Sequence, residues 1–126
     1  MKALLIRYLA IGAAGFIGAI SRVLIGVLFT RLPGRFPLGT LFINVSGSFF
    51  LGWFYTYAGA RNISPTVRLA IGAGFVGAYT TFSTYMFDTS KLAEDGAQIE
   101  AWVNLIGSLV LGLIAVRLGI MLARWT

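Results

Sequence analysis

Polar side chains recur at helical spacing within long apolar stretches of this sequence. Thr40, Asn44 and Ser48 lie four residues apart, which places them on one face of a helix. Asn104 and Ser108 repeat the same spacing in a later stretch. Each of these groups is neutral and can donate a hydrogen bond. Such a row of donors can replace the water around a small anion, although single polar residues in membrane helices more often hold helices together.

Hydroxyl groups are also concentrated in residues 77–85. They belong to Thr80, Thr81, Ser83 and Thr84. Hydroxyls of this kind offer the backbone partners other than its own helical ones. Irregular backbone at membrane depth is tolerated only where it is buried in protein or lines a water-filled cavity. We therefore predict a break in the helix near Thr80.

Three further residues suit an anion, although each also has a simpler interpretation. Arg22 lies inside the first apolar run, where it either extends to the interface from a helix end or faces a wet cavity as an electropositive entrance. Phe82 and Tyr85 follow three residues apart beside the predicted break. The edge of an aromatic ring carries partial positive charge and can contact an anion. Packing is the simpler role for both rings.

The composition excludes several classes of function. The chain has no cysteine and no histidine, so thiolate metal sites, disulfides, Cys nucleophiles and His bases are absent. All four acidic residues fall between positions 88 and 100, which leaves residues 1–87 without a carboxylate. We expect no enzymatic activity. The net charge of +6 is better explained by Lys and Arg at helix ends than by nucleic acid, which we do not expect as a partner.

Hydropathy predicts an all-α membrane protein. Hydrophobic residues make up 58% of the 126 residues, and the mean hydropathy is +0.86. Four apolar runs long enough to cross a bilayer can be drawn, at about 3–29, 39–59, 65–87 and 99–122. Ser64 and Pro65 suit the N-cap and first position of the third run. The chain is expected to form one transmembrane domain, residues 1–126, with the third helix broken.

The distribution of basic residues says little about orientation. With four crossings, one side of the membrane receives six Lys and Arg residues and the other receives four. The rule that positive loops stay inside therefore gives only a weak preference. A weak preference permits insertion in both orientations, and hence an antiparallel dimer, without requiring one.

Three stretches together resemble the bacterial fluoride channel family, the Fluc or CrcB-type proteins. They are GAAGFIGAISR at 12–22, GTLFINVSGSFFLG at 39–52 and GFVGAYTTFSTY at 74–85. Chain length and helix number also match. The resemblance implies a dual-topology antiparallel homodimer in the lipid bilayer, with two fluoride pores along the subunit interface. It also implies a structural Na⁺ at the dimer centre, held by the backbone carbonyls of Gly77 and Thr80.

The resemblance assigns further roles by motif position. Asn44, Phe82, Ser83, Thr84 and Ser108 correspond to pore residues, and Arg22 corresponds to an arginine near a vestibule. The sequence departs from the family at two pore positions. Tyr85 stands where a second phenylalanine is usual, and Asn104 stands where a tyrosine often precedes the serine by four residues.

The function that the resemblance implies is passive export of fluoride through a selective channel in the cell inner membrane, which protects the cell from fluoride toxicity. A small dual-topology proton-coupled exporter is a rival, but it needs a membrane carboxylate, and residues 1–87 contain none. A structural membrane subunit is the other rival, in which the polar stripes only join helices. The residues alone do not exclude this second rival.

Overall fold

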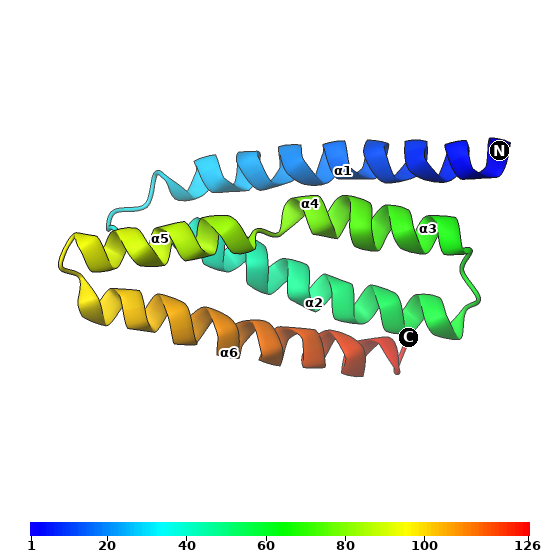
Figure 1. Cartoon of the computed structure of the whole chain (residues 1–126). Helices are drawn as coiled ribbons and strands as arrows, with labels where there is room; N and C mark the ends of the chain where they lie inside the picture. The colour runs from blue at the N-terminus through cyan, green and yellow to red at the C-terminus, as the bar shows by residue number, and fades with distance from the viewer.

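All regular secondary structure in the protein is helical. The computed structural model describes residues 1–126 and contains α1 (Lys2–Phe29), α2 (Leu38–Ala60), α3 (Pro65–Leu69), η1 (Ala70–Val76), α4 (Gly77–Tyr79), α5 (Phe82–Glu94) and α6 (Gln98–Ala123). The expected all-helical class is confirmed. In Figure 1, α1 and α6 lie at the two outer edges, and α2 and the α3–α5 stretch lie between them. Both chain ends and the turn between α2 and α3 lie toward one end of the bundle.

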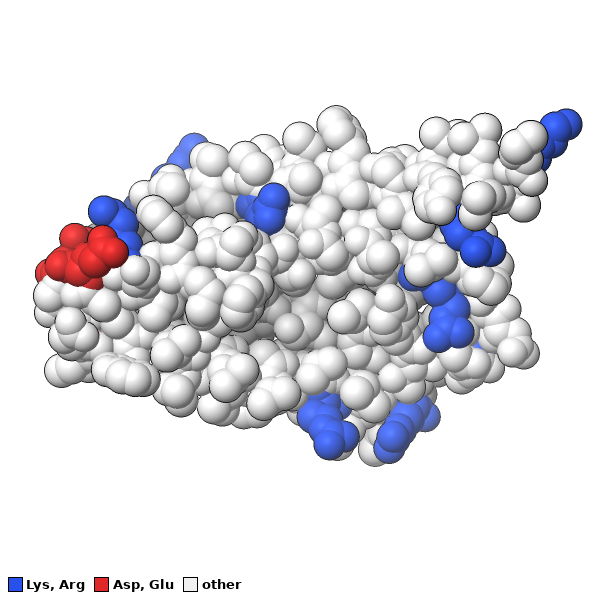
Figure 2. Space-filling view, viewed as in Figure 1, with Lys and Arg blue, Asp and Glu red and all other residues white.

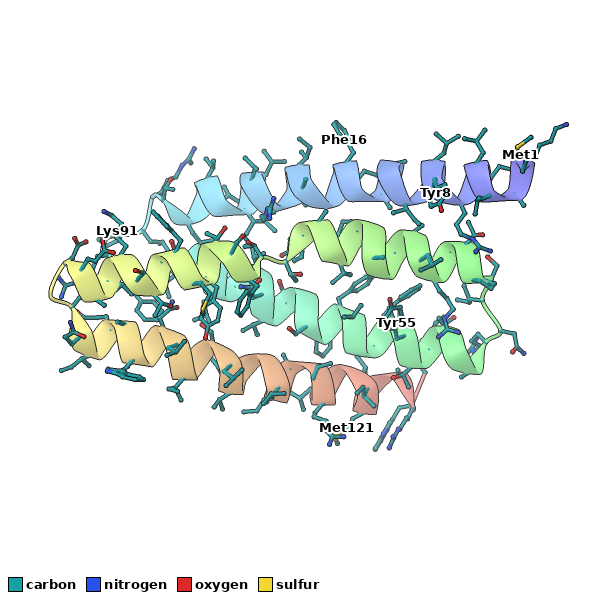
Figure 3. The ribbon with its side chains drawn as sticks, viewed as in Figure 1. Met1, Tyr8, Phe16, Tyr55, Lys91 and Met121 are labelled. Carbon is teal, nitrogen blue, oxygen red and sulfur yellow. The ribbon has the colours of Figure 1, made fainter.

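Three of the helices are long and apolar enough to cross a membrane. These are α1, α2 and α6, with mean hydropathies of 2.0, 1.2 and 2.3 in their most apolar windows. Most of their large apolar side chains face outward; Phe16 on α1 is 70% exposed and Met121 on α6 is 55% exposed. Figure 3 shows both pointing away from the other helices. Outward-facing apolar side chains along whole helices suit lipid as the surrounding solvent.

Glycines let the helices approach closely. A Cβ at Gly119 of α6 would collide with the Phe49 carbonyl oxygen of α2. In the same way, a Cβ at Gly18 of α1 would collide with the Phe75 carbonyl of η1. Small residues at such contacts allow backbone-to-backbone packing, which is the main source of helix association in lipid. These contacts fix α6 against α2, and α1 against η1.

The α3–α5 stretch is irregular along its length. The Ser64 hydroxyl accepts a hydrogen bond from the Val67 N–H at 3.4 Å, which confirms Ser64 as the N-cap before Pro65. The seven residues of η1 form a π-helix, whose wider turns are uncommon and often lie near functional sites. Beyond α4, Thr80 and Thr81 adopt extended backbone angles before α5 begins.

The last helical segment of this stretch is longer than the sequence suggested. We expected a loop over residues 88–98, whereas α5 continues to Glu94 and only residues 95–97 separate it from α6. Lys91, Leu92 and Ala93 are good helix formers. Leu92 is buried against Ala97 and Ala101, so tertiary packing supports the additional turns. The charged residues Asp88 and Lys91 therefore lie within α5 and do not end it.

Candidate functional site

The two extended residues, Thr80 and Thr81, are held by a side chain of α2. The Asn44 Nδ2 donates a hydrogen bond to the Thr81 carbonyl at 3.0 Å, and the Thr81 N–H donates to Asn44 Oδ1 at 2.7 Å. The Asn44 side-chain amide thus makes the same two hydrogen bonds to the Thr81 backbone that a backbone peptide group could make. Gly47, one turn further along α2, lies so close that a Cβ there would collide with the Thr80 methyl. Asn44 and Gly47 together fix where the interruption lies on α2.

The hydroxyl of Thr81 begins α5. Thr81 Oγ1 accepts from the Thr84 N–H at 3.2 Å, donates to Thr84 Oγ1 at 3.0 Å and lies 3.3 Å from Ser83 Oγ. Thr81 is also buried, with 7% of its surface exposed. From the sequence we had placed Thr81 among the hydroxyls expected to interrupt the helix, without identifying it as an N-cap. A threonine three residues before another polar residue at a helix start is an N-cap signal that could have identified it.

The interruption leaves backbone carbonyls without their helical donors. In a continuous helix, the Thr81 N–H would bond to the Gly77 carbonyl and the Thr84 N–H to the Thr80 carbonyl. Here the first N–H is taken by Asn44 and the second by the Thr81 hydroxyl. The carbonyls of residues 77–80 thereby lose their helical donors, and those of Gly77 and Thr80, the residues that the resemblance assigned to sodium, are among them.

A cavity of 420 Å³ opens beside this interruption. Its wall is formed by α2, α6 and the start of α5, and it includes Asn44, Ser48, Thr80, Thr81, Phe82, Tyr85 and Ser108. None of its lining residues is charged. Asn44 uses one Nδ2 hydrogen on Thr81, and the second has no acceptor within the chain. This free N–H is the cavity's strongest candidate for contact with an anion.

Phe82 and Tyr85 form an aromatic pair in the cavity wall. Their ring centroids are 6.0 Å apart and their planes are inclined at 69°, so one ring presents its edge to the face of the other. Phe82 is 74% exposed, whereas Tyr85 is only 8% exposed. The Tyr85 hydroxyl donates a hydrogen bond to the Leu105 carbonyl of α6. The hydroxyl therefore joins α5 to α6, and the Tyr85 ring is the part that lines the cavity.

The structure separates Asn104 from the cavity wall. Asn104 is 1% exposed, and its Nδ2 donates to Thr89 Oγ1 of α5 at 2.8 Å. Its Oδ1 accepts a hydrogen bond from Ser108 Oγ at 3.3 Å. Ser108 does line the cavity. Asn104 thus fills the contact between α5 and α6 and orients the Ser108 hydroxyl.

A second cavity, of 590 Å³, lies toward the loop between α1 and α2. Arg22, Thr40, Thr84 and Asp88 line it, together with much of the segment 29–39. The Thr40 hydroxyl donates to the Asp88 carboxylate at 2.7 Å. Thr81 lines both cavities, so they approach the interruption from two directions. The expected stripe of Thr40, Asn44 and Ser48 therefore runs from the second cavity into the first.

The predicted site residues are thus distributed over four places, of which the α5–α6 contact that holds Asn104 is one. Asn44, Phe82, Tyr85 and Ser108 line the first cavity, and Arg22 and Thr84 line the second. Ser83 lies on the exposed surface of α5 and lines neither cavity. The chain has no group of three or more acidic side chains that could hold a metal ion.

Comparison with known proteins identifies the family of the chain. The family model described as CrcB-like protein, Camphor Resistance (CrcB), matches residues 9–120. A protein of Chlorobium chlorochromatii, named fluoride-specific ion channel FluC, is 41% identical over 118 residues, covering 93% of this chain and 92% of the relative. The protein of the same name in Acidobacterium capsulatum is 43% identical over 120 residues, with 94% and 96% covered. The one in a Synechococcus strain is 46% identical over 117 residues, with 91% and 88% covered.

Proposed function

The chain belongs to the CrcB-like family, and its relatives are fluoride channels of the membrane and not enzymes. From this premise we propose that it exports fluoride passively across the cell inner membrane. The observation that carries the proposal is the 420 Å³ cavity, which combines neutral donors, exposed aromatic edges and no charged side chain. Export down the electrochemical gradient would protect the cell from fluoride toxicity. It requires no transported proton.

Neutral donors suit the conduction of a strongly hydrated ion. Fluoride must exchange its water shell for protein groups to enter a narrow path. The free Asn44 N–H supplies a donor, and the ring edge of Phe82 supplies weaker positive charge. Ser108 would become a second donor only by turning its hydroxyl away from Asn104 Oδ1. Conduction requires binding that is strong enough to admit the ion and weak enough to release it. The positive charge of Arg22 stays in the outer cavity, where it attracts an anion without holding it in the narrow part.

The stretch from α3 to α5 forms a third, broken transmembrane crossing in this proposal. A broken helix needs protein or water around it, since unpaired backbone in lipid costs several kcal/mol. Gly77, Phe82 and Ser83 are exposed on the single chain. A second subunit packed over this face would cover them. We therefore propose an antiparallel homodimer of dual topology, which the weak charge bias permits.

Sodium fits the released carbonyls of the break. Na⁺ is a hard cation and prefers oxygen ligands, as other hard cations do. The Gly77 and Thr80 carbonyls have lost their helical donors to Asn44 and Thr81. Each subunit of a dimer would contribute the same pair. The bound ion would supply a fixed positive charge that holds the two breaks together.

Fluoride efflux from liposomes that contain the purified protein tests the proposal. A fluoride electrode would record release driven by a potassium gradient with valinomycin, and a chloride electrode would record chloride under the same conditions. We expect fast fluoride release and no comparable chloride release. Absence of release above that of empty liposomes would indicate a structural subunit. Release that requires a proton gradient would indicate a proton-coupled exporter and not a channel.

A matched variant separates specific effects from general ones. Thr56→Val removes a hydroxyl from the same helix as Asn44, and this hydroxyl bonds only to its own backbone at Gly52. Thr56 lines neither cavity. The variant should conduct as the unmodified protein does.

A further inference from the structure

Charge is divided unequally between the two ends of the bundle. All four acidic residues lie near the α5–α6 connection, and Figure 2 shows them in red at one end only. The opposite end, which we call the basic end, carries basic residues and no acidic side chain. Its members lie in the first turns of α1, around the α2–α3 turn and in the last two turns of α6, and they are Lys2, Arg7, Arg61, Arg68, Arg117 and Arg124.

None of these six side chains forms an ion pair with an acidic side chain. The only ion pair joins Arg35 to Glu100 at 2.6 Å, and it lies at the acidic end. Arg61 donates to the main-chain oxygen of Thr126 at 2.6 Å and lies 4.9 Å from the centre of the Tyr57 ring, and these two contacts hold its guanidinium in place. The Nε of Arg7 is buried and has no hydrogen-bond partner. A guanidinium that is partly removed from water and lacks a counter-charge favours an external anion.

The side chains around the two arginines of α6 indicate where such an anion would be found. Arg117 and Arg124 are seven residues apart, so they lie on the same face of the helix, about 10 Å from each other along its axis. Both are exposed, and the neighbouring Leu118 and Met121 are 52% and 55% exposed. Trp125, which is 88% exposed, follows directly. Basic and aromatic side chains at the end of an apolar helix are typical of the headgroup region of a bilayer.

We propose that the basic end binds the headgroup phosphates of anionic phospholipids such as phosphatidylglycerol. The arginines stand among apolar side chains that contact acyl chains, which a free phosphate ion or a soluble acidic protein would not satisfy. Arginine presents planar pairs of N–H groups that match phosphate oxygens. At the other end, the four carboxylates balance the four basic residues Arg22, Arg31, Arg35 and Lys91, and one of them pairs with Arg35, so that end has no excess positive charge for an anionic headgroup. The lipid preference therefore belongs to one end of the chain.

Two tryptophans allow the two ends to be compared within one protein. Trp125 reports on the basic end, and Trp102, which is 62% exposed, lies two residues from Glu100 at the acidic end. One variant would keep only Trp125 and a second only Trp102, with the other tryptophans replaced by phenylalanine. Each would be placed in phosphatidylcholine vesicles with a minor fraction of phosphatidylglycerol. Bromine on the acyl chains of one lipid or the other then quenches fluorescence where that lipid is enriched.

We expect brominated phosphatidylglycerol to quench Trp125 more than brominated phosphatidylcholine does at the same mole fraction. For Trp102, we expect the two brominated lipids to quench equally. Combining Arg117→Gln with Arg124→Gln should lower the preference at Trp125 about fivefold for each charge removed. High salt should weaken it as well. Arg31→Gln, an exposed arginine of the acidic end, serves as the matched control and should leave the preference unchanged.

Three results would overturn the proposal. They are equal quenching of Trp125 by both lipids, an unchanged preference in the double variant, and an equal loss in the Arg31→Gln control. Circular dichroism would show that each variant retains its helices. Neither readout depends on fluoride conduction.

Discussion

Replacing Asn44 with aspartate changes one atom of the side chain and two interactions at once. The carboxylate can still accept a hydrogen bond from the Thr81 N–H, but it cannot donate to the Thr81 carbonyl as Nδ2 does now at 3.0 Å. It also removes the free N–H that lines the uncharged cavity and puts a negative charge in its place. We therefore expect Asn44→Asp to abolish fluoride efflux while the helices stay assembled.

The two effects differ in size. Leaving the Thr81 carbonyl without a donor costs about 1–3 kcal/mol of stability. An ion bound where the free N–H now points would lie about 4 Å from the new charge, which repels it by about 4 kcal/mol at an effective dielectric constant near 20. Since about 1.4 kcal/mol corresponds to a tenfold change, occupancy by fluoride falls roughly a thousandfold. The loss of conduction should thus exceed any loss of folded protein.

Efflux and folding have to be measured on the same preparations. Fluoride release from liposomes gives conduction, and gel filtration in detergent with circular dichroism gives assembly and helix content. Thr56→Val, on the same helix, provides the control. Normal efflux in a well-folded Asn44→Asp protein would show that fluoride does not pass the Asn44 cavity. Loss of efflux in the control as well would show only general sensitivity of α2.

Three further changes test other parts of the site. Phe82→Leu should abolish efflux and leave the protein folded, because the ring is 74% exposed and contributes little to the interior; normal efflux would remove the ring edge from the mechanism. Tyr85→Phe should keep efflux and lower the unfolding free energy by about 1 kcal/mol, since only the bond to the Leu105 carbonyl is lost. Lost efflux with unchanged thermal unfolding would show instead that the hydroxyl serves the ion. Replacing Na⁺ with N-methylglucamine during purification and assay should reduce efflux and dimer content, and identical values in both salts would argue against sodium at the Gly77 and Thr80 carbonyls.

Hydropathy and composition were sufficient for the elements that depend on local sequence. Long apolar runs predicted α1, α2 and α6, because a helix is the structure that satisfies backbone groups in lipid. Ser64 and Pro65 predicted the start of α3 from cap chemistry alone. The length of α5 was missed, since its last turns depend on Leu92 packing against Ala97 and Ala101.

Pairings between distant residues could not be obtained from the sequence. The Asn44 amide meets Thr81 across 37 residues, and nothing local to either residue indicates the contact. The same spacing that put Asn104 and Ser108 on one helix face did not reveal that Asn104 turns toward Thr89, which depends on how α5 lies against α6. Tyr85 gave no sign of where its hydroxyl points, for the same reason.

The pairing of Asn44 with Thr81 also bears on how the chain is made. The Thr81 N–H and carbonyl would each cost several kcal/mol if they entered lipid without partners, and their partner lies earlier in the chain. Synthesis from the N-terminus delivers α2 to the bilayer first, so the amide is in place when the extended residues arrive. A circular permutant that began at α3 would present bare backbone to the lipid before its partner existed, and it should insert poorly although every contact of the finished protein remained possible.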